Sequence, residues 1–306
     1  MLALGLRLAS ALCFATMAML VKYAGEMGLP LPEIIFWRQF MALPLIGCWL
    51  WWTGGLHRLR SNRIPAHAAR ALSGTFTMTL TFTAAMLLPL SISTTLGFTT
   101  PLFAVVISGL FMGERVGPWR WTSVLLGFLG VLIIGLWGAS PNGGTAASTA
   151  MASLPALGLL AGLFAGLGTA IINFQVRDLG RTEEPVRVVF WFAAFGSLAA
   201  STLLPFYGSA HDAREWLMLT GIGTIGLCGQ LCMTAALRVG AVASIVVMDY
   251  STLIWATIFG WLVWDTLPGT GTWFGAPLII AAGLIIAWRQ NHLYRTNPAA
   301  SQTQPD

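Results

Sequence analysis

The sequence predicts an all-α polytopic membrane protein with ten transmembrane helices, arranged as two inverted five-helix repeats. Of its 306 residues, 56% are hydrophobic and only 9% are charged, and the mean hydropathy is +0.76. A soluble domain carries about a quarter of charged residues. Ten apolar stretches have roughly the 20 residues that a helix needs to cross the hydrocarbon core of a bilayer. The loops between them are alternately rich in arginine and nearly free of it.

The ten apolar stretches follow one another with short connections. They are Leu8–Gly25, Ile34–Trp52, Ala69–Leu87, Ser91–Met112, Trp119–Trp137, Met151–Phe174, Val188–Phe206, Trp216–Ala236, Ala241–Trp264 and Trp273–Trp288. The first stretch has a second interpretation, a cleaved signal peptide, because Arg7 precedes it. It lacks a small-residue cleavage site at its end and continues through Lys22, so we expect it to remain as the first helix.

The arginines predict the orientation, because Lys and Arg near helix ends are retained on the cytoplasmic side. With the N-terminus inside, the cytoplasmic loops hold Arg7, Arg58, Arg60, Arg63, Arg70, Arg115, Arg120, Arg177, Arg181, Arg187, Arg238, Arg289 and Arg295. The opposite side holds Arg214 and the acids Glu26, Glu33, Asp212, Glu215 and Asp265. Both termini are therefore predicted to be cytoplasmic, in the inner membrane of a bacterium. The net charge of +5 follows from this topology, so we expect no nucleic-acid binding.

Catalytic and metal-binding groups are not expected inside the membrane. The histidines fall in predicted loops or tails: His57, His67, His211 and His292. Asp249 is the only deep acid, so the paired groups that intramembrane hydrolysis needs are missing. Cys228 and Cys232 lie one helical turn apart, and we interpret them as packing residues because no His or third Cys shares a neighbouring span. No Walker A loop occurs. The sequence therefore predicts a protein that is not an enzyme and needs no metal or cofactor.

An internal repeat divides the chain. A shift of 151 residues aligns Ala84–Glu114 with Ala235–Asp265 without a gap, and the pair Phe36-Trp37 recurs as Phe190-Trp191 at a nearby offset. Chance similarity among apolar helices is the alternative. Five spans per half is an odd number, so the second copy must insert upside down, an arrangement typical of transporters. We expect repeats at 1–140 and 151–290, an uncharged periplasmic linker at 141–150 and a disordered cytoplasmic tail at 291–306.

Several short motifs resemble a known family. Pro101-Leu102-Phe103, Gly113-Glu114-Arg115, Gly127 and Gly130-Val131-Leu132 are similar to the EamA repeat of the drug/metabolite transporter superfamily. Arg38 is similar to the arginine that this family usually carries in its second helix, where it bridges helix ends or carbonyls. In the second half the pattern is degraded, with Thr252 at the Pro position and Asp265 at the Glu. The aromatic-rich helices look most like those of bacterial exporters of aromatic amino acids, and this resemblance implies efflux.

Charge inside the membrane indicates where a substrate would bind, because an ionised group at mid-bilayer costs at least about 2.5 kcal/mol. Asp249 lies deepest in its span. The repeat pairs Asp249 and Tyr250 with Phe98 and Thr99, so both pairs are expected to face one cavity. Lys22 is a further candidate, with snorkelling to the interface as the alternative.

Apolar and hydroxyl side chains complete the predicted lining. Thr75, Met78, Thr79 and Phe82 follow helical spacing on the third span, although such a stripe is more often helix packing. The other expected lining residues are Phe14, Met17, Phe164, Gln230 and Thr234. Methionines beside aromatic rings form a wall that accepts flat apolar shapes.

Small residues and prolines indicate where helices move. Gly158, Gly162 and Gly166 form a small-xxx-small stripe that permits close helix contact and sliding. Pro101 interrupts the backbone hydrogen bonds of its span and is expected to act as a hinge. Arg38 is also expected to have a structural or gating role.

These features predict a secondary transporter that exports amino acids, aromatic ones first, by alternating access. The alternatives are other cargo, such as cationic drugs, purine-like metabolites or nucleotide sugars, and, more remotely, a channel or a structural membrane subunit. The expected partners are a small-molecule substrate and membrane lipid, and a monomer is expected, with a dimer as the alternative.

Overall fold

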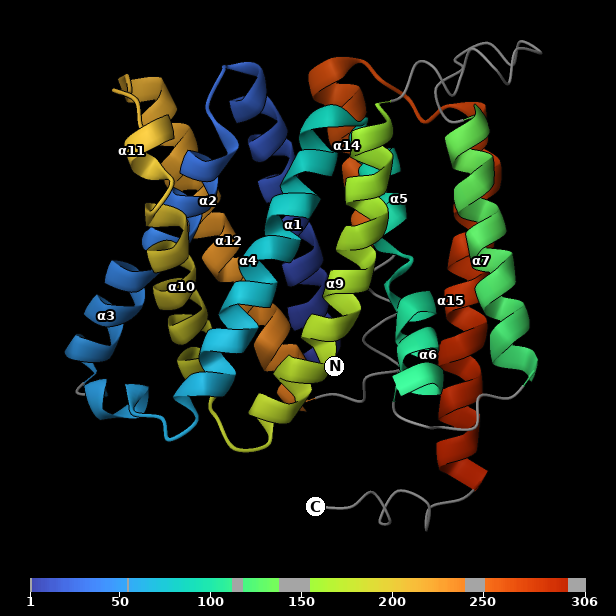
Figure 1. Cartoon of the computed structure of the whole chain (residues 1–306), viewed down its shortest axis with the longest axis horizontal. Coiled ribbons are helices and arrows are strands. Elements are labelled where there is room, and N and C mark those ends of the chain that lie inside the picture. The colour runs from blue at the N-terminus through green and yellow to red at the C-terminus, as the bar shows by residue number, and fades with distance from the viewer. Residues whose placement is uncertain (1, 54, 112–117, 138–154, 240–250, 297–306) are drawn as a thin grey trace.

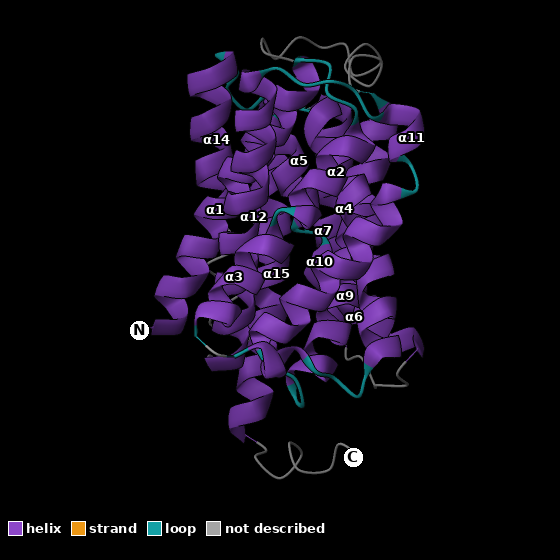
Figure 2. Ribbon diagram, turned by 90° about the vertical axis from the view of Figure 1, so that its left-hand side faces the viewer, coloured by secondary structure: helices purple, strands orange, loops and turns teal. Residues whose placement is uncertain are grey.

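The protein is a bundle of helices that run roughly parallel or antiparallel to one another, close to vertical in Figure 1. The computed structural model describes residues 2–53, 55–111, 118–137, 155–239 and 251–296. The helices are α1 (Leu2–Glu26), α2 (Leu31–Phe40), α3 (Ala42–Trp52), the short 3-10 helix η1 (Leu56–Leu59), α4 (Ile64–Leu87), α5 (Leu90–Gly97), α6 (Thr100–Phe111), α7 (Pro118–Trp137), α9 (Ala156–Gly180), α10 (Pro185–Ser201), α11 (Leu204–Tyr207), α12 (Ala213–Val239), α14 (Ser251–Trp264) and α15 (Thr270–Thr296). Within these residues Figure 2 shows helices joined by loops and no strand, so the all-α prediction is confirmed.

The described helices have the length and surface of membrane spans. Five segments are long and apolar enough to cross a bilayer: Gly5–Glu26, Leu31–Trp52, Leu90–Ile107, Ala156–Gly180 and Ala213–Ala236. Large apolar side chains point outward, among them Phe76, Leu125 and Phe274. Such a surface is incompatible with water and matches the apolar tails of lipid.

Two spans are broken where proline removes a backbone donor. Pro44 cannot donate to the carbonyl of Phe40, and the chain turns at Met41 between α2 and α3. Pro101 likewise separates α5 from α6. There the hydroxyl of Thr99 donates to the carbonyl of Leu96 at 2.7 Å, and the hydroxyl of Thr100 donates to that of Gly97 at 2.7 Å. The hydroxyl of Thr100 thus satisfies the Gly97 carbonyl to which Pro101 cannot donate, while the Leu96 carbonyl also accepts the backbone N–H of Thr99 at 3.1 Å.

Equivalent helices of the two repeats run in opposite directions (Figure 1). We call the end of the bundle that holds residues 55–63 and 181–184 the basic end, and the end that holds residues 27–33 and 208–215 the acidic end. α4 starts at the basic end and its repeat mate α12 starts at the acidic end; α10 and α2 are related in the same way. The start of α1 and the end of α15 both lie toward the basic end (Figures 1 and 2).

Glycines set the closest helix contacts. The stripe of α9 faces α5 and the end of α4: a methyl group on Gly158 would lie 2.9 Å from Leu88 Cγ, one on Gly162 would lie 2.7 Å from Leu96 Cδ1, and one on Gly166 would collide with the hydroxyl of Thr99. A methyl group on Gly130 of α7 would lie 2.7 Å from the carbonyl oxygen of Gly275 in α15. Close approach of this kind is the usual use of small residues in membrane helices.

The structure differs from the sequence prediction at three places. α4 begins at Ile64, so His67 and Arg70 lie inside a helix and are buried, although both were expected in a cytoplasmic loop. Glu33 was expected outside and is 3% exposed within α2. α15 continues to Thr296 and takes in the first residues of the predicted tail. The apolar window begins too late to include the first turns of α4, because those turns are polar and are covered by other helices. The predicted linker at 141–150 and the rest of the tail lie outside the described residues.

Candidate functional site

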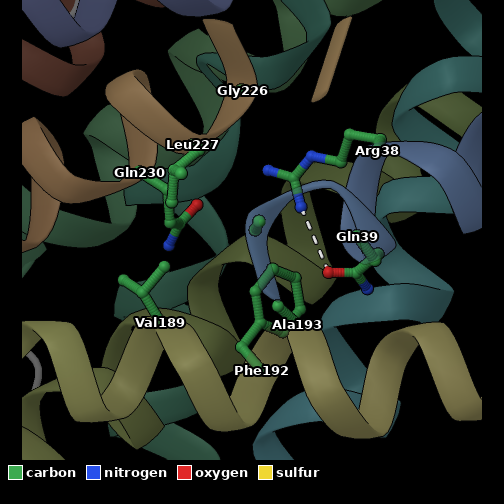
Figure 3. Close-up of a pocket in the computed structure, with 9 residues that line it drawn as sticks. Arg38, Gln39, Val189, Phe192, Ala193, Gly226, Leu227 and Gln230 are labelled. Atoms are coloured by element: carbon green, nitrogen blue, oxygen red, sulfur yellow. Dashed lines mark hydrogen bonds between the residues drawn. The ribbon is translucent and has the colours of Figure 1, made fainter. Parts of the chain in front are cut away.

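A small cavity lies between α2, α3, α10 and α12, where helices of both repeats meet (Figure 3). Its lining consists of Arg38, Gln39, Ala42, Val189, Phe192, Ala193, Gly226, Leu227 and Gln230. It leaves about 10 Å³ for the centre of a water molecule, which is the space that one ordered water needs. This cavity has a guanidinium group in its wall.

Arg38 supplies that group. Its side chain is 7% exposed, and its Nη1 donates a long hydrogen bond of 3.4 Å to Oε1 of the neighbouring Gln39. Its Nε is buried and has no hydrogen-bond partner among the residues that the structure describes. A methyl group on Gly226 would lie 3.1 Å from this Nε, so the glycine leaves the room that the guanidinium occupies. Figure 3 shows the guanidinium extending into the cavity toward Gln230.

A second guanidinium belongs to Arg70 of α4. Arg70 is 3% exposed, and both its Nε and its Nη1 are buried without a hydrogen-bond partner in the described part of the chain. Phe192 lies between the two arginines in the packing: its ring centroid is 4.5 Å from Cζ of Arg70 and 5.5 Å from Cζ of Arg38. These are cation–π distances, and the attraction strengthens when water is excluded. The ring therefore holds two like charges in one buried region.

Gln39 connects this region to α4. Its Nε2 donates to the hydroxyl of Thr75 at 3.0 Å. A methyl group on Gly196 of α10 would collide with Nε2 of Gln39 and lie 2.9 Å from the hydroxyl of Thr75. The amide of Gln39 is thus fixed from α4 and α10 at once.

At the basic end, an ion-pair network joins the loop before α4 to the loop before α10. Arg58 donates twice to Oε2 of Glu184, at 2.9 and 2.5 Å, and Arg63 pairs with Asp178. Glu183 accepts hydrogen bonds from Ser61 at 2.6 Å and from Arg187 at 2.5 Å. Burial alone would raise the pKa of Glu183, but these hydrogen bonds and the nearby positive charges outweigh it and lower the pKa.

At the acidic end, a second network centres on His211. Its Nε2 lies 2.5 Å from Oε1 of Glu33, and its Nδ1 lies 3.1 Å from Oε2 of Glu215. Asp212 and Glu215 form a reciprocal cap at the start of α12, each backbone N–H donating to the other's carboxylate. Burial alone would lower the pKa of His211, but the hydrogen bonds and charges of Glu33 and Glu215 outweigh it and raise the pKa.

Several predicted lining residues gather in one apolar cluster rather than around the cavity. Met17, Met78 and Phe82 are buried together, with Phe14 packed against them. Phe98 belongs to a second cluster beside Leu96 and α9. Of the predicted lining, Gln230 reaches the cavity, Thr75 bonds Gln39 beside it, and Thr234 and Thr79 return bonds to their own helices.

Three other predicted lining residues lie away from the cavity. Phe164 is 52% exposed on the outer surface of α9, which places it against lipid rather than in the bundle. Lys22 donates to the carbonyl of Leu88 at 3.1 Å and lies 5.4 Å from the ring of Trp264, so it is tied to helix ends. Thr99 is buried against Gly166. Asp249 and Tyr250 lie outside the described residues.

The sequence interpretation missed Arg70, Phe192 and Gln39. Positive-inside counting placed Arg70 on the cytoplasmic side, because it is the second residue of the predicted span Ala69–Leu87 and therefore lies at the span's edge. Phe192 carried a usable signal, since it follows Phe190-Trp191 as Arg38 follows Phe36-Trp37. Aligned on this motif, the arginine and the ring occupy equivalent positions of the two repeats.

Comparisons with known proteins agree with this architecture. The EamA-like transporter family matches residues 1–136 and again residues 156–288. The chain is 28% identical over 275 residues to the pseudopaline exporter CntI of Pseudomonas aeruginosa, covering 90% of this chain and 92% of the relative. It is 27% identical over 289 residues to the riboflavin transporter of Vibrio cholerae, covering 92% and 91%. These relatives differ in name from the aromatic amino acid exporters that the sequence suggested.

A solved structure shares the fold. It superposes with a TM-score of 0.58 at 19% identity, covering 93% of this chain and 98% of that one. Two matches to one family in a single chain, with repeat mates that run in opposite directions, identify a double-domain bundle of about ten helices. The chain belongs to the EamA-like transporter family of the drug/metabolite transporter superfamily, and it is a secondary transporter, not an enzyme.

Proposed function

We propose that this transporter exports small zwitterionic organic solutes, aromatic amino acids first among them, across a bacterial inner membrane by alternating access, with both termini in the cytoplasm. The observation that carries the proposal is the pair of polar networks at opposite ends of the bundle. Each network joins residues of the two repeats: Ser61 donates to Glu183 at the basic end, and His211 meets Glu33 at the acidic end.

The two networks are arranged as alternate gates would be. On the Phe-Trp alignment, Glu33 of α2 is equivalent to Arg187 of α10. Glu33 pairs with His211 of the second repeat at the acidic end, and Arg187 donates to the carbonyl of Arg58 of the first repeat, at 2.5 Å, at the basic end. Opening one end requires breaking one network while the other holds. An inverted repeat supplies this alternation, because the same hinge motion of either half opens opposite sides.

The interior offers contacts to a solute with a flat apolar part and a polar part. Arg38, Gln39 and Gln230 supply the donors and acceptors of the cavity, and Phe192 supplies a ring. The buried methionines Met17 and Met78 adapt their shape more readily than branched side chains do. The chemistry favours an aromatic amino acid over a cationic drug, because two guanidiniums would repel a cation.

A second candidate cargo is a flat neutral metabolite of the riboflavin type. It is favoured by relatives named as riboflavin transporters in Vibrio cholerae and Brucella anthropi, at 27% and 28% identity. An uncharged solute would use the rings and amides of the site and leave the guanidiniums without a counter-charge.

Flux measurements in proteoliposomes test the proposal. Purified full-length protein is reconstituted, and the release of preloaded tryptophan, phenylalanine, threonine, riboflavin and a sugar nucleotide is compared with and without a pH gradient. We expect saturable release of the two aromatic amino acids. Selective release of riboflavin or of the nucleotide would show that this solute, and not an aromatic amino acid, is the cargo. Non-saturable flux would indicate a channel.

A further inference from the structure

The strongest unexplained feature of the described chain is a pair of buried cations with no counter-charge. The ion pairs of the described residues use other arginines, namely Arg58, Arg63 and Arg187. Arg38 and Arg70 are 7% and 3% exposed, and three of their nitrogens are buried without a partner. Removing a charge from water costs several kcal/mol unless it is paired and hydrogen-bonded. A bound anion would offset the cost of burying two such charges near one ring.

The surroundings of the two arginines are shaped to keep them there. Glycines on three helices leave the space: a methyl group on Gly74 would collide with Nη1 of Arg70, one on Gly196 would collide with Gln39, and one on Gly226 would lie 3.1 Å from Arg38. Side chains at these positions would fill the region and displace the guanidiniums. The packing therefore leaves room for polar side chains at buried positions, where burying apolar residues would cost less free energy.

A purely structural role does not account for these groups. An arginine that bridges helix ends would donate to carbonyls or carboxylates, yet among the described residues Arg38 makes a 3.4 Å contact with its neighbour Gln39. The amide of Gln230 faces Arg38 across the cavity (Figure 3), and within the described residues it has no hydrogen-bond partner of its own. Donors converge on the cavity from α2 and α12, which belong to different repeats.

We propose that the cavity between Arg38, Gln39 and Gln230, with Arg70 behind the ring of Phe192, binds the carboxylate of an organic solute. A guanidinium presents parallel N–H groups that match the two oxygens of a carboxylate. Phe192 at the cavity wall would contact an aromatic or aliphatic part of the same solute. The present cavity has room for only one water molecule, so binding of a carboxylate requires the cavity to widen, for example by rotation of the Gln230 side chain. The solute's identity rests on the proposed function, but the binding itself is independent of transport.

Thermal unfolding of the full-length protein in detergent tests the site. Equal concentrations of sodium phenylacetate, of neutral phenylacetamide and of sodium chloride are added to separate samples. We expect phenylacetate alone to raise the Tm of the wild-type protein. An equal rise with chloride would show a site for an inorganic anion, and an equal rise with phenylacetamide would show that the charge is not recognised. Either result, or no rise with phenylacetate, overturns the proposal.

Variants separate binding from folding. In Arg38→Met and Arg70→Met we expect the apparent affinity for phenylacetate to fall about tenfold or more, because a charge-assisted hydrogen bond or a close charge is lost. We also expect the ligand-free Tm to stay level or rise, because an unpaired buried charge is removed. Arg181→Gln, which removes an exposed arginine, should keep both the Tm and the phenylacetate response of the wild type.

The outcomes also separate this site from the transport proposal. A fall in the ligand-free Tm of both methionine variants would show that the guanidiniums are structural and would overturn the site. Undiminished phenylacetate binding in those variants would do the same. If no amino acid is transported in proteoliposomes while the phenylacetate response persists and depends on both arginines, the site stands and the proposed cargo fails.

Discussion

Arg38 and Phe192 occupy equivalent positions of the two repeats, and the guanidinium of Arg38 lies 5.5 Å from the centroid of the Phe192 ring. Each follows a Phe-Trp pair, and in both pairs the rings meet edge to face, with centroids 5.1 Å apart in α2 and 5.8 Å apart in α10. The two repeats therefore present different chemistry to each other at one pseudo-symmetric point, a cation from the first and a π surface from the second.

Replacing Phe192 should weaken the packing of both arginines. Phe192→Leu removes two cation–π contacts and part of a buried side chain, so we expect a loss of about 2 kcal/mol of unfolding free energy. Phe195→Leu on the same helix removes a ring that stacks on Trp191 at 5.4 Å and should cost about half as much. Thermal unfolding compares the two. A double-mutant cycle with Arg70→Met should show a coupling energy, and strict additivity would contradict the contact.

His211 should make the acidic-end network sensitive to pH. Its pKa is raised in the folded protein, so protonated His211 contributes stability fully below its unfolded pKa of about 6.5. This contribution is lost as the pH rises through the folded pKa. We expect the difference in Tm between wild type and His211→Gln to be largest near pH 6 and to shrink toward pH 9. His57→Gln, at an exposed histidine, should show no such trend; a constant difference for His211→Gln would refute the prediction.

Adjacent glutamates at the basic end should differ in their contribution to stability. Glu183 is 7% exposed and accepts from Ser61 and Arg187, so Glu183→Gln should lower the unfolding free energy by about 2 to 3 kcal/mol. Glu184 forms an ion pair whose partners are both more than a third exposed, so Glu184→Gln should cost less than about 1 kcal/mol. Chemical denaturation at pH 7 measures both.

The lowered pKa of Glu183 predicts that this residue stops stabilising the fold at low pH. Because the pKa of Glu183 is lowered on folding, its contribution is present above its unfolded pKa of about 4.3 and is lost as the pH falls through the folded pKa. The Tm difference between wild type and Glu183→Gln should therefore narrow in acid. A gap that widens as the pH is lowered would be inconsistent with the network.

The glycine stripe of α9 should tolerate little added volume. Gly166→Ala puts a methyl group against the hydroxyl of Thr99, so we expect a loss of about 1 to 3 kcal/mol from overpacking. Gly47→Ala on α3, where nothing lies within 4 Å of the added methyl, should stabilise by up to about 1 kcal/mol through helix propensity. Unfolding curves that coincide for the two variants would mean that α9 is not closely packed there.

Labelling of single cysteines should place the two ends on opposite sides of the membrane. In a variant whose four native cysteines are replaced, Ser209→Cys lies at the acidic end and Arg60→Cys at the basic end (Figure 1). A membrane-impermeant maleimide should label Ser209→Cys in whole cells and Arg60→Cys only in inverted vesicles, because arginine-rich loops stay in the cytoplasm. The reverse pattern would invert the proposed orientation.

Sequence patterns determined the spans and their repetition. Each of the ten apolar stretches overlaps at least one helix that the structure describes, from α1 to α15, because lipid requires each span to satisfy its own backbone hydrogen bonds and to expose apolar side chains. The recurring Phe-Trp pair and the alternation of arginine-rich loops are likewise visible in the sequence alone. They predict how deep each segment lies in the membrane and which side each loop faces.

Which polar groups meet depends on how the helices pack against one another. His211 and Glu33 are 178 residues apart in the chain, and Ser61 and Glu183 are 122 apart. Arg70 reads as a loop residue because burial by other helices leaves no mark in its own segment. Hydropathy records the environment of each helix separately, whereas pairing across helices depends on how they pack. The buried arginines around Phe192 are therefore a property of the assembled bundle.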